Sequence, residues 1–245
     1  MSNQEKTTYN AHKNPIFISL AIFFSIFIIY FLMVQSFNLL CYGFKNFIYI
    51  LMNNCKSYES LSRVIIISKE DAYKAVSKMM QFLHDPKMKK LVHIAVINTH
   101  WDNFFSDRTV LHLVDVKNIF IFALRTSKCL FLISLILIPV SFITKNLRNL
   151  YHIWLRTLIF ICVVIASIAT TAIINFSTFF VIFHKILFDN DLWLLNPYKD
   201  YLINLLPEEF FAKFAICAII VFLIFCFVFS FFLRTLSRLE AKSYL

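Results

Sequence analysis

Four long apolar stretches constrain what this sequence can fold into. Hydrophobic residues make up 60% of the chain and charged residues only 16%, so a soluble domain of this size could not bury its apolar surface. A helix needs about 20 apolar residues to cross the hydrocarbon core of a bilayer. The sequence therefore predicts an α-helical integral membrane protein with four transmembrane helices. They are expected at residues 15–40, 118–144, 153–175 and 211–233.

The distribution of basic residues indicates how these helices are oriented. Basic side chains crowd the link between the second and third helices, at Lys145 and Arg148, and they follow the last helix at Arg234 and Arg238. The segment between the third and fourth helices is longer but carries only two lysines. Because short loops rich in Lys and Arg stay in the cytoplasm, we expect both termini to be inside. The cytoplasmic parts are then residues 1–14, 145–152 and 234–245, and the extracytoplasmic parts are residues 41–104 and 176–210.

Residues 41–104 are predicted to form a small extracytoplasmic cap of mixed α+β structure. Ser68 and Asp71 resemble a helix capping box, and an apolar pattern at helical spacing follows them. Residues 64–67 and 91–97 are rich in β-branched side chains and are expected to pair as strands.

Two further segments are predicted to continue outside the membrane. A single long helix is expected over residues 105–144, because Ser106 suits an N-cap and no helix breaker occurs before Pro139. Its first part lies outside and its second part is the second span. Residues 176–210 hold many aromatic side chains, which suit a segment at headgroup depth. His184 is expected to extend the helix of the third span beyond its outer end.

Arg108, His112 and Asp115 are candidates for chemistry on the long helix. Their spacing of i−4, i and i+3 places them on one face. A carboxylate beside an imidazole fixes its tautomer and raises its basicity, as acid–base catalysis or metal binding requires. The alternative is that His112 and Asp115 are interfacial residues solvated by headgroups. Taken by itself, His184 could likewise be an ordinary interfacial histidine.

Other polar residues are open to ordinary structural explanations. Arg125 lies within the apolar part of the second span, where it is expected either to snorkel or to hold polar lipid. His93 and His100 fall in the cap and are expected to satisfy local hydrogen bonds. Cys41 and Cys55 also lie outside and could form a disulfide, but the sequence does not fix their separation.

The sequence lacks the motifs that are typical of several classes of function. The six cysteines show no metal-ligand spacing, and neither a GxSxG nucleophile motif nor an HExxH zinc helix is present. One glycine excludes a glycine-rich phosphate loop. The net charge of +10 comes from scattered lysines without interleaved aromatic residues, so nucleic acid is not an expected partner.

The outer segments contain two motifs. The first is Phe105-Ser-Asp-Arg108 followed by His112-Leu-Val-Asp-Val-Lys117. The second contains Phe183-His184, Phe188-Asp-Asn-Asp191, Trp193, Pro197, Asp200 and Leu206-Pro207. Together they resemble the lipoprotein intramolecular transacylase (Lit) family of low-GC Gram-positive bacteria. The motifs cover about 50 residues, and the four-helix layout with an outer cap is similar over nearly the whole length.

The resemblance implies an acyltransferase that acts on a lipoprotein within the membrane lipid. The family's substrate carries a diacylglyceryl group on a cysteine whose α-amino group is free. The enzyme moves the sn-2 acyl chain onto that amine, which gives an N-acylated, S-monoacylated lyso-form lipoprotein. Because donor and acceptor belong to one molecule, the enzyme has to bring them together and manage protons. No cofactor and no metal is expected.

The resemblance also implies roles for single residues. His112 and His184 are expected to act as acid and base, with the assignment between them open, and Asp115 is expected to support His112. The family commonly has a glutamate where this chain has Thr109, so no carboxylate acts there. The residues expected to bind substrate are Arg108, Arg125, Asp189, Asp191 and Trp193.

Two alternatives of a different class remain. His112, Asp115 and His184 would also suit a zinc site in a membrane hydrolase, with Asp189 or Asp191 as a further ligand. A third possibility is a non-enzymatic membrane protein whose outer cap binds another protein. Metal analysis of the purified protein distinguishes a zinc hydrolase from an acyltransferase. Mass spectrometry of lipoproteins distinguishes both enzymes from a non-enzymatic protein.

The basic loops generate a prediction of topology. A reporter fused after Leu245 should be active only in the cytoplasm, and a reporter inserted near Asn98 should be active only outside, because the positive-inside bias fixes both ends. Paired cytoplasmic and extracytoplasmic reporters at each position measure this. The reverse pattern would refute both the orientation and the outer location of the motifs.

Overall fold

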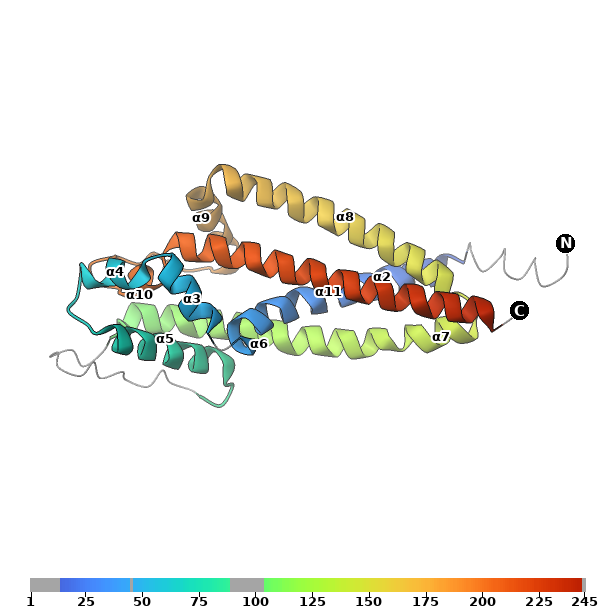
Figure 1. Cartoon of the computed structure of the whole chain (residues 1–245), viewed down its shortest axis with the longest axis horizontal. Coiled ribbons are helices and arrows are strands. Elements are labelled where there is room, and N and C mark those ends of the chain that lie inside the picture. The colour runs from blue at the N-terminus through green and yellow to red at the C-terminus, as the bar shows by residue number, and fades with distance from the viewer. Residues whose placement is uncertain (1–13, 45, 89–103, 244–245) are drawn as a thin grey trace, which may run out of the picture. The chain divides into compact units, whose positions relative to one another are not determined.

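The structure is a computed structural model that describes residues 14–44, 46–88 and 104–243. Within these residues every regular element is helical (Figure 1). The elements are α2 (Pro15–Asn38), the π-helix η1 (Leu39–Gly43), α3 (Phe47–Asn54), α4 (Ser57–Ser62), α5 (Lys69–His84), α6 (Asp107–Leu135), α7 (Leu137–Ile143), α8 (Leu147–Ile174), α9 (Phe176–Leu187), α10 (Leu202–Leu205) and α11 (Glu208–Lys242).

Four helical segments are long and apolar enough to cross a membrane, which confirms the predicted number. They are Pro15–Gly43, Asp107–Ile143, Leu147–Ile174 and Glu208–Lys242. The second segment is interrupted by a turn at Ile136, between α6 and α7. Pro139 has no N–H to offer the carbonyl of Leu135, and α6 ends at that residue.

The chain divides into two compact units. The first unit holds Met1–Phe37, Arg125–Ala169 and Ile219–Leu245, and the second holds Asn38–Leu124 and Thr170–Ala218. Of the residues that the sequence nominates for function, Arg125 alone belongs to the first unit. The second unit therefore carries the candidate site.

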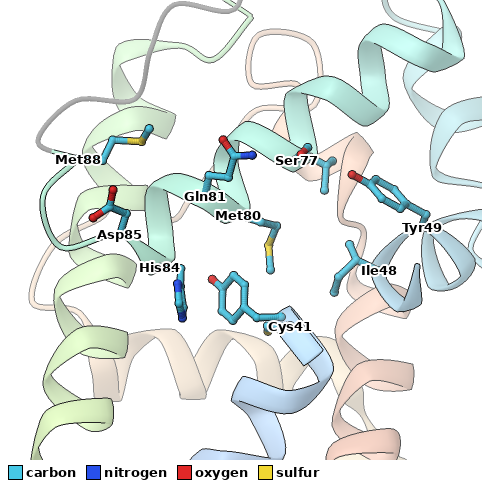
Figure 2. Close-up of a pocket in the computed structure, with 11 residues that line it drawn as sticks. Cys41, Ile48, Tyr49, Ser77, Met80, Gln81, His84, Asp85 and Met88 are labelled. Atoms are coloured by element: carbon cyan, nitrogen blue, oxygen red, sulfur yellow. The ribbon is translucent and has the colours of Figure 1, made fainter. Parts of the chain in front are cut away.

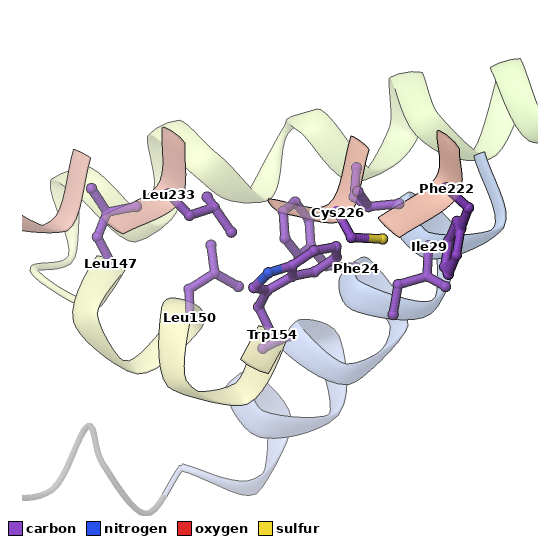
Figure 3. Packing of buried hydrophobic residues seen from close by; sticks show 10 residues of the cluster. Phe24, Ile29, Leu147, Leu150, Trp154, Phe222, Cys226 and Leu233 are labelled. Atoms are coloured by element: carbon purple, nitrogen blue, oxygen red, sulfur yellow. The ribbon is translucent and has the colours of Figure 1, made fainter. Parts of the chain in front are cut away.

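Trp154 lies at the centre of the first unit's apolar core. Its side chain is fully buried, and its ring packs edge to face on Phe229 with centroids 4.8 Å apart. The indole Nε1–H donates to the Ser230 hydroxyl over 2.9 Å, which in turn donates to the Cys226 carbonyl. Figure 3 shows Trp154 among residues from α2, α8 and α11. The buried cluster is Ala21, Phe24, Ile28, Ile29, Leu147, Leu150, Trp154, Phe222, Cys226 and Leu233.

In the second unit, the predicted cap of α5 is confirmed. The Ser68 hydroxyl accepts from the Asp71 N–H over 3.1 Å, and the Asp71 carboxylate accepts from that hydroxyl over 2.7 Å. The apolar face of α5 is buried. Lys117 joins α6 to the end of this helix, because its ammonium donates to the Met88 carbonyl and lies 4.2 Å from the centroid of the Phe82 ring.

The predicted β-structure of the cap is wrong for the residues that the structure describes. Residues 64–67 form a turn followed by an extended stretch, and the described cap contains no strand. The Ile67 carbonyl accepts from the Tyr58 hydroxyl over 3.0 Å, so a side chain satisfies it in place of a neighbouring strand. Residues 91–97, His93 and His100 lie outside the described residues. Cys41 and Cys55 are both free thiols.

The outer end of the third span also differs from expectation. Asn175 has extended backbone angles, and its side chain accepts from the Thr178 N–H over 2.9 Å. This cap starts a separate helix, α9. His184 therefore lies on α9 and not on a continuation of α8.

The bond between Trp154 and Ser230 generates a prediction of stability. Ser230→Ala should lower the free energy of unfolding by about 0.5–1.5 kcal/mol, because it leaves an indole N–H unpaired between membrane helices. Unfolding in mixed micelles measures the loss. Ser237→Ala is the matched control, since the Ser237 hydroxyl donates to the Arg234 carbonyl of its own helix. Equal losses in the two variants would contradict a specific role for the indole bond.

Candidate active site

His112 lies in the second turn of α6, which begins outside the apolar part of the second span. The start of the helix is fixed by Ser106, whose hydroxyl accepts from the Thr109 N–H over 3.1 Å. The His112 side chain is only 7% exposed. Its Nδ1 is buried and has no hydrogen-bond partner among the residues that the structure describes. Buried polar atoms are rarely left unpaired, so this nitrogen is available for a ligand.

His184 lies on α9 and is 8% exposed. Its Nδ1 is 2.7 Å from the Phe180 carbonyl oxygen. Because a carbonyl oxygen only accepts, Nδ1 carries the hydrogen, and Nε2 of the neutral ring keeps its lone pair. Burial lowers the pKa of His184 below its ordinary value, and the bond to Phe180 partly offsets this effect. His184 is therefore suited to accept a proton at neutral pH.

The two imidazoles lie side by side with ring centroids 6.0 Å apart. Phe188 contacts both of them, with its ring centroid 5.0 Å from that of His112 and 5.7 Å from that of His184. The indole of Trp193 stacks on His184 at 5.0 Å. Two groups that can exchange protons are thus enclosed by aromatic rings. Such a pair can take a proton at one ring and give one at the other.

The segment that carries Phe188 and Trp193 is held against α6 by polar contacts. The Arg108 guanidinium donates to the backbone carbonyl of Asp191. The Asn190 side-chain amide donates to the Asp115 carboxylate over 3.0 Å. Asp115 thus binds this segment directly.

Asp200 makes the most extensive of these contacts. Its side chain is 4% exposed. One carboxylate oxygen accepts from the hydroxyls of Ser106 and Thr109, and the other accepts from the Asn196 N–H over 2.7 Å. A single buried carboxylate therefore joins the first turn of α6 to the segment after α9.

The structure brings together only part of the residue set predicted from sequence. His112, His184 and Trp193 form one buried cluster. The side chains of Asp189 and Asp191 are exposed, and Arg125 is exposed in the other unit.

Sequence reasoning gave no separate role to Phe188 or Asp200. Both lie in the second motif, but nothing in a segment rich in aromatic and acidic residues distinguishes them from their neighbours. Within the described part of the chain, no three His, Cys, Asp or Glu side chains are grouped as a metal site would require.

The fold and the histidine cluster define a helical membrane protein with a buried pair of imidazoles. The family model of the lipoprotein intramolecular transacylase Lit matches residues 9–211. The chain therefore belongs to the Lit family, and it is an acyltransferase.

Solved structures of the membrane integral lipoprotein intramolecular transacylase Lit from Bacillus cereus share the fold. One has a TM-score of 0.66 at 24% identity, and the match covers 94% of this chain and 97% of the solved chain. Another, which carries a histidine-to-arginine mutation, has a TM-score of 0.68 at 21% identity, and the match covers 99% of this chain and 98% of the solved chain. A comparison with curated proteins finds no match.

The buried carboxylate generates the next prediction. Asp200→Ala should lower the free energy of unfolding by about 1–3 kcal/mol, because it leaves buried hydroxyl and N–H donors without an acceptor. Acyltransferase activity should fall with it, since the segment with Phe188 and Trp193 loses one of its attachments to α6. Thermal unfolding in detergent and a product assay measure the two effects. Asp189→Ala, at an exposed carboxylate, is the matched control, and a loss of stability as large as that of Asp200→Ala would contradict the prediction.

Proposed function

We propose that the chain transfers the sn-2 acyl chain of a diacylglyceryl-cysteine lipoprotein onto the α-amino group of the same cysteine, with His112 and His184 moving the protons. One observation carries the proposal. The two imidazoles are buried 6.0 Å apart, and the Nδ1 of His112 has no partner in the described part of the chain. The membership of the Lit family supplies the class of reaction.

The chemistry needs two proton movements. The amine nitrogen attacks the ester carbonyl, so that an amide C–N bond forms and the ester C–O bond breaks. The nitrogen loses a proton and the departing glyceryl oxygen gains one. An α-amine has a pKa of about 8, so a neutral histidine is a suitable base near neutral pH.

The tautomer of His184 supports an assignment of roles. Its Nδ1–H is held by the Phe180 carbonyl, so Nε2 is the atom that takes the proton from the amine. The proton that His184 takes then passes to His112, which gives it to the departing glyceryl oxygen. Both rings are then neutral again for the next reaction.

The aromatic surroundings contribute by excluding water. Phe188 and Trp193 are each 8% exposed and cover the imidazoles. Water near an activated ester would hydrolyse it, so a dry site favours transfer to the amine. Holding amine and ester together in this site accounts for most of the expected catalysis, because effective molarity is high when both groups belong to one molecule.

The remaining nominated residues have supporting roles. The exposed carboxylates of Asp189 and Asp191 attract the ammonium form of the substrate. Arg108 and Asp115 position the segment that follows α9. Arg125 holds polar lipid. The basic loops support a site on the outer face of the cell membrane, where diacylglyceryl lipoproteins present their amino groups.

The proton-transfer scheme makes a direct prediction. His112→Ala and His184→Ala should each lower the yield of lyso-form lipoprotein by about 10²–10⁴-fold, which is the usual contribution of a general acid or base. Mass spectrometry of the N-terminal lipopeptide from cells making each variant measures the product.

Controls separate chemistry from folding in this experiment. His152→Ala makes the same change at an exposed histidine on α8 and should keep near-normal activity. His93→Ala and His100→Ala should also keep most activity. The product yield of Asp115→Asn should fall between those of the two groups, because asparagine keeps a hydrogen-bonding shape without the charge. Near-normal product from His112→Ala or His184→Ala, with the protein present in the membrane, would refute the scheme.

A further inference from the structure

Trp193 differs from the phenylalanines that pack on the two imidazoles. In the described part of the chain, the other carbocyclic rings that contact His112 or His184 belong to Phe180, Phe183 and Phe188. A phenylalanine ring offers no hydrogen-bond donor, whereas an indole has an N–H that only donates. Trp193 therefore brings a polar group to this place that covering the histidines does not require.

The indole N–H of Trp193 is unpaired. The side chain is 8% exposed, and its Nε1 has no hydrogen-bond partner within residues 14–44, 46–88 and 104–243. The nitrogen is not fully enclosed, so an acceptor can reach it. The indole of Trp154, in contrast, donates to the Ser230 hydroxyl. Because a buried indole N–H usually has a partner, the one on Trp193 is available for an acceptor on the substrate.

Other side-chain donors near the pair are engaged in holding the segment after α9. The Arg108 guanidinium donates to the Asp191 carbonyl, and the Asn190 amide donates to the Asp115 carboxylate. The Nδ1–H of His184 is held by a backbone carbonyl. Trp193 thus combines contact with an imidazole and a donor that has no other partner in the described structure.

A separate cavity in the same unit gathers several other polar side chains. It encloses about 570 Å³ between η1, α3 and α5, and Figure 2 shows Tyr49, Gln81 and His84 around it. Within the described residues, no hydrogen bond or ring contact joins its lining to His112 or His184. Its donors are therefore not placed at the reacting groups.

Transfer of an acyl group places negative charge on oxygen. When the amine nitrogen attacks the ester carbonyl, the C=O π electrons move to the carbonyl oxygen, which becomes an oxyanion in the tetrahedral intermediate. Collapse re-forms the C=O bond and breaks the bond to the glyceryl oxygen, which takes its proton from His112. A donor held at the oxyanion speeds both steps, and it acts more strongly in a site closed to water than in solution.

We propose that the Trp193 indole N–H donates to the carbonyl oxygen of the sn-2 ester and stabilises the oxyanion of the tetrahedral intermediate. The proposal rests on the proposed function, because it concerns the same ester and the same histidine pair. The Trp193 ring stacks on His184 with centroids 5.0 Å apart and 28° between the planes. An oxyanion donor lies about 2.7–3.1 Å from the oxygen, so the base and this donor are within reach of one ester group.

Two replacements of Trp193 remove the N–H and keep an aromatic ring. One is Trp193→Phe, and the other is the benzothiophene analogue of tryptophan, in which sulfur takes the place of the N–H at nearly constant shape. The assay uses the full-length protein in lipid nanodiscs and a diacylglyceryl-cysteinyl peptide. We expect each replacement to lower kcat by about 10²–10³-fold and to change KM by less than about twofold, because the bond strengthens only as the oxyanion forms.

A second readout separates the N–H from the exclusion of water. Trp193→Ala removes the ring as well as the N–H, and it should also release free fatty acid because water then reaches the ester. The two ring-keeping replacements should release no more free fatty acid than the unaltered protein. Normal kcat in the benzothiophene analogue, or a lower kcat accompanied by free fatty acid, would overturn the oxyanion role.

A measurement on the unaltered protein does not depend on how the variants fold. A phosphonate analogue of the ester places an anionic oxygen where the oxyanion forms. When it binds, the indole N–H proton resonance of Trp193 should move downfield, whereas that of Trp154, already bonded to Ser230, should stay in place. An unchanged Trp193 resonance would contradict the proposal.

Gln81→Leu is the matched control, because it removes a side-chain donor from the separate cavity and should leave kcat unchanged. An equal loss of kcat in this variant would assign the effect of Trp193 to general disturbance of the unit. Failure of the proposed function itself is distinct, because the unaltered protein would then convert no peptide substrate.

Discussion

Lipid leaves a backbone no water with which to form hydrogen bonds, and the rest of this structure depends on that constraint. Each spanning segment satisfies its own N–H and C=O groups as a helix. Polar chemistry is therefore confined to the ends of the spans. α6 meets both demands in one uninterrupted helix, apolar in its second part and polar around His112 in its first turns.

The segment after α9 depends in turn on polar contacts with that helix. Three side chains make these contacts, each with a different group: Arg108, Asp115 and Asp200. They hold the segment so that the rings of Phe188 and Trp193 lie against the two imidazoles. The acids of the second motif differ in their surroundings. The buried carboxylate of Asp200 joins two segments, whereas the carboxylates of Asp189 and Asp191 are exposed.

The sequence predicted those features that depend on local physics. The four apolar segments, the cap at Ser68 and the start of the long helix at Ser106 follow from length, spacing and capping, and the structure has all three. Features that depend on tertiary context were less accessible. Residues 64–67 have β-branched side chains but form no strand. Whether such residues form a strand depends more on packing against neighbouring strands than on an intrinsic preference of the backbone.

The candidate site shows the same division. The i, i+3 spacing of His112 and Asp115 is correct, yet Asp115 bonds to Asn190 from a segment 75 residues away in the sequence. The approach of His184 to His112 is also a long-range contact. No periodicity in either segment specifies it, and only the similarity of both motifs to one family placed the two histidines in a common site.

An intramolecular transfer has no second substrate to recognise. The diacylglyceryl group is the same in every substrate and is already dissolved in the bilayer, so binding it adds little selectivity. Binding energy from the rest of the substrate is useful only if it holds the amine beside the ester, because interactions remote from the reaction act by restricting the motion of the reacting groups.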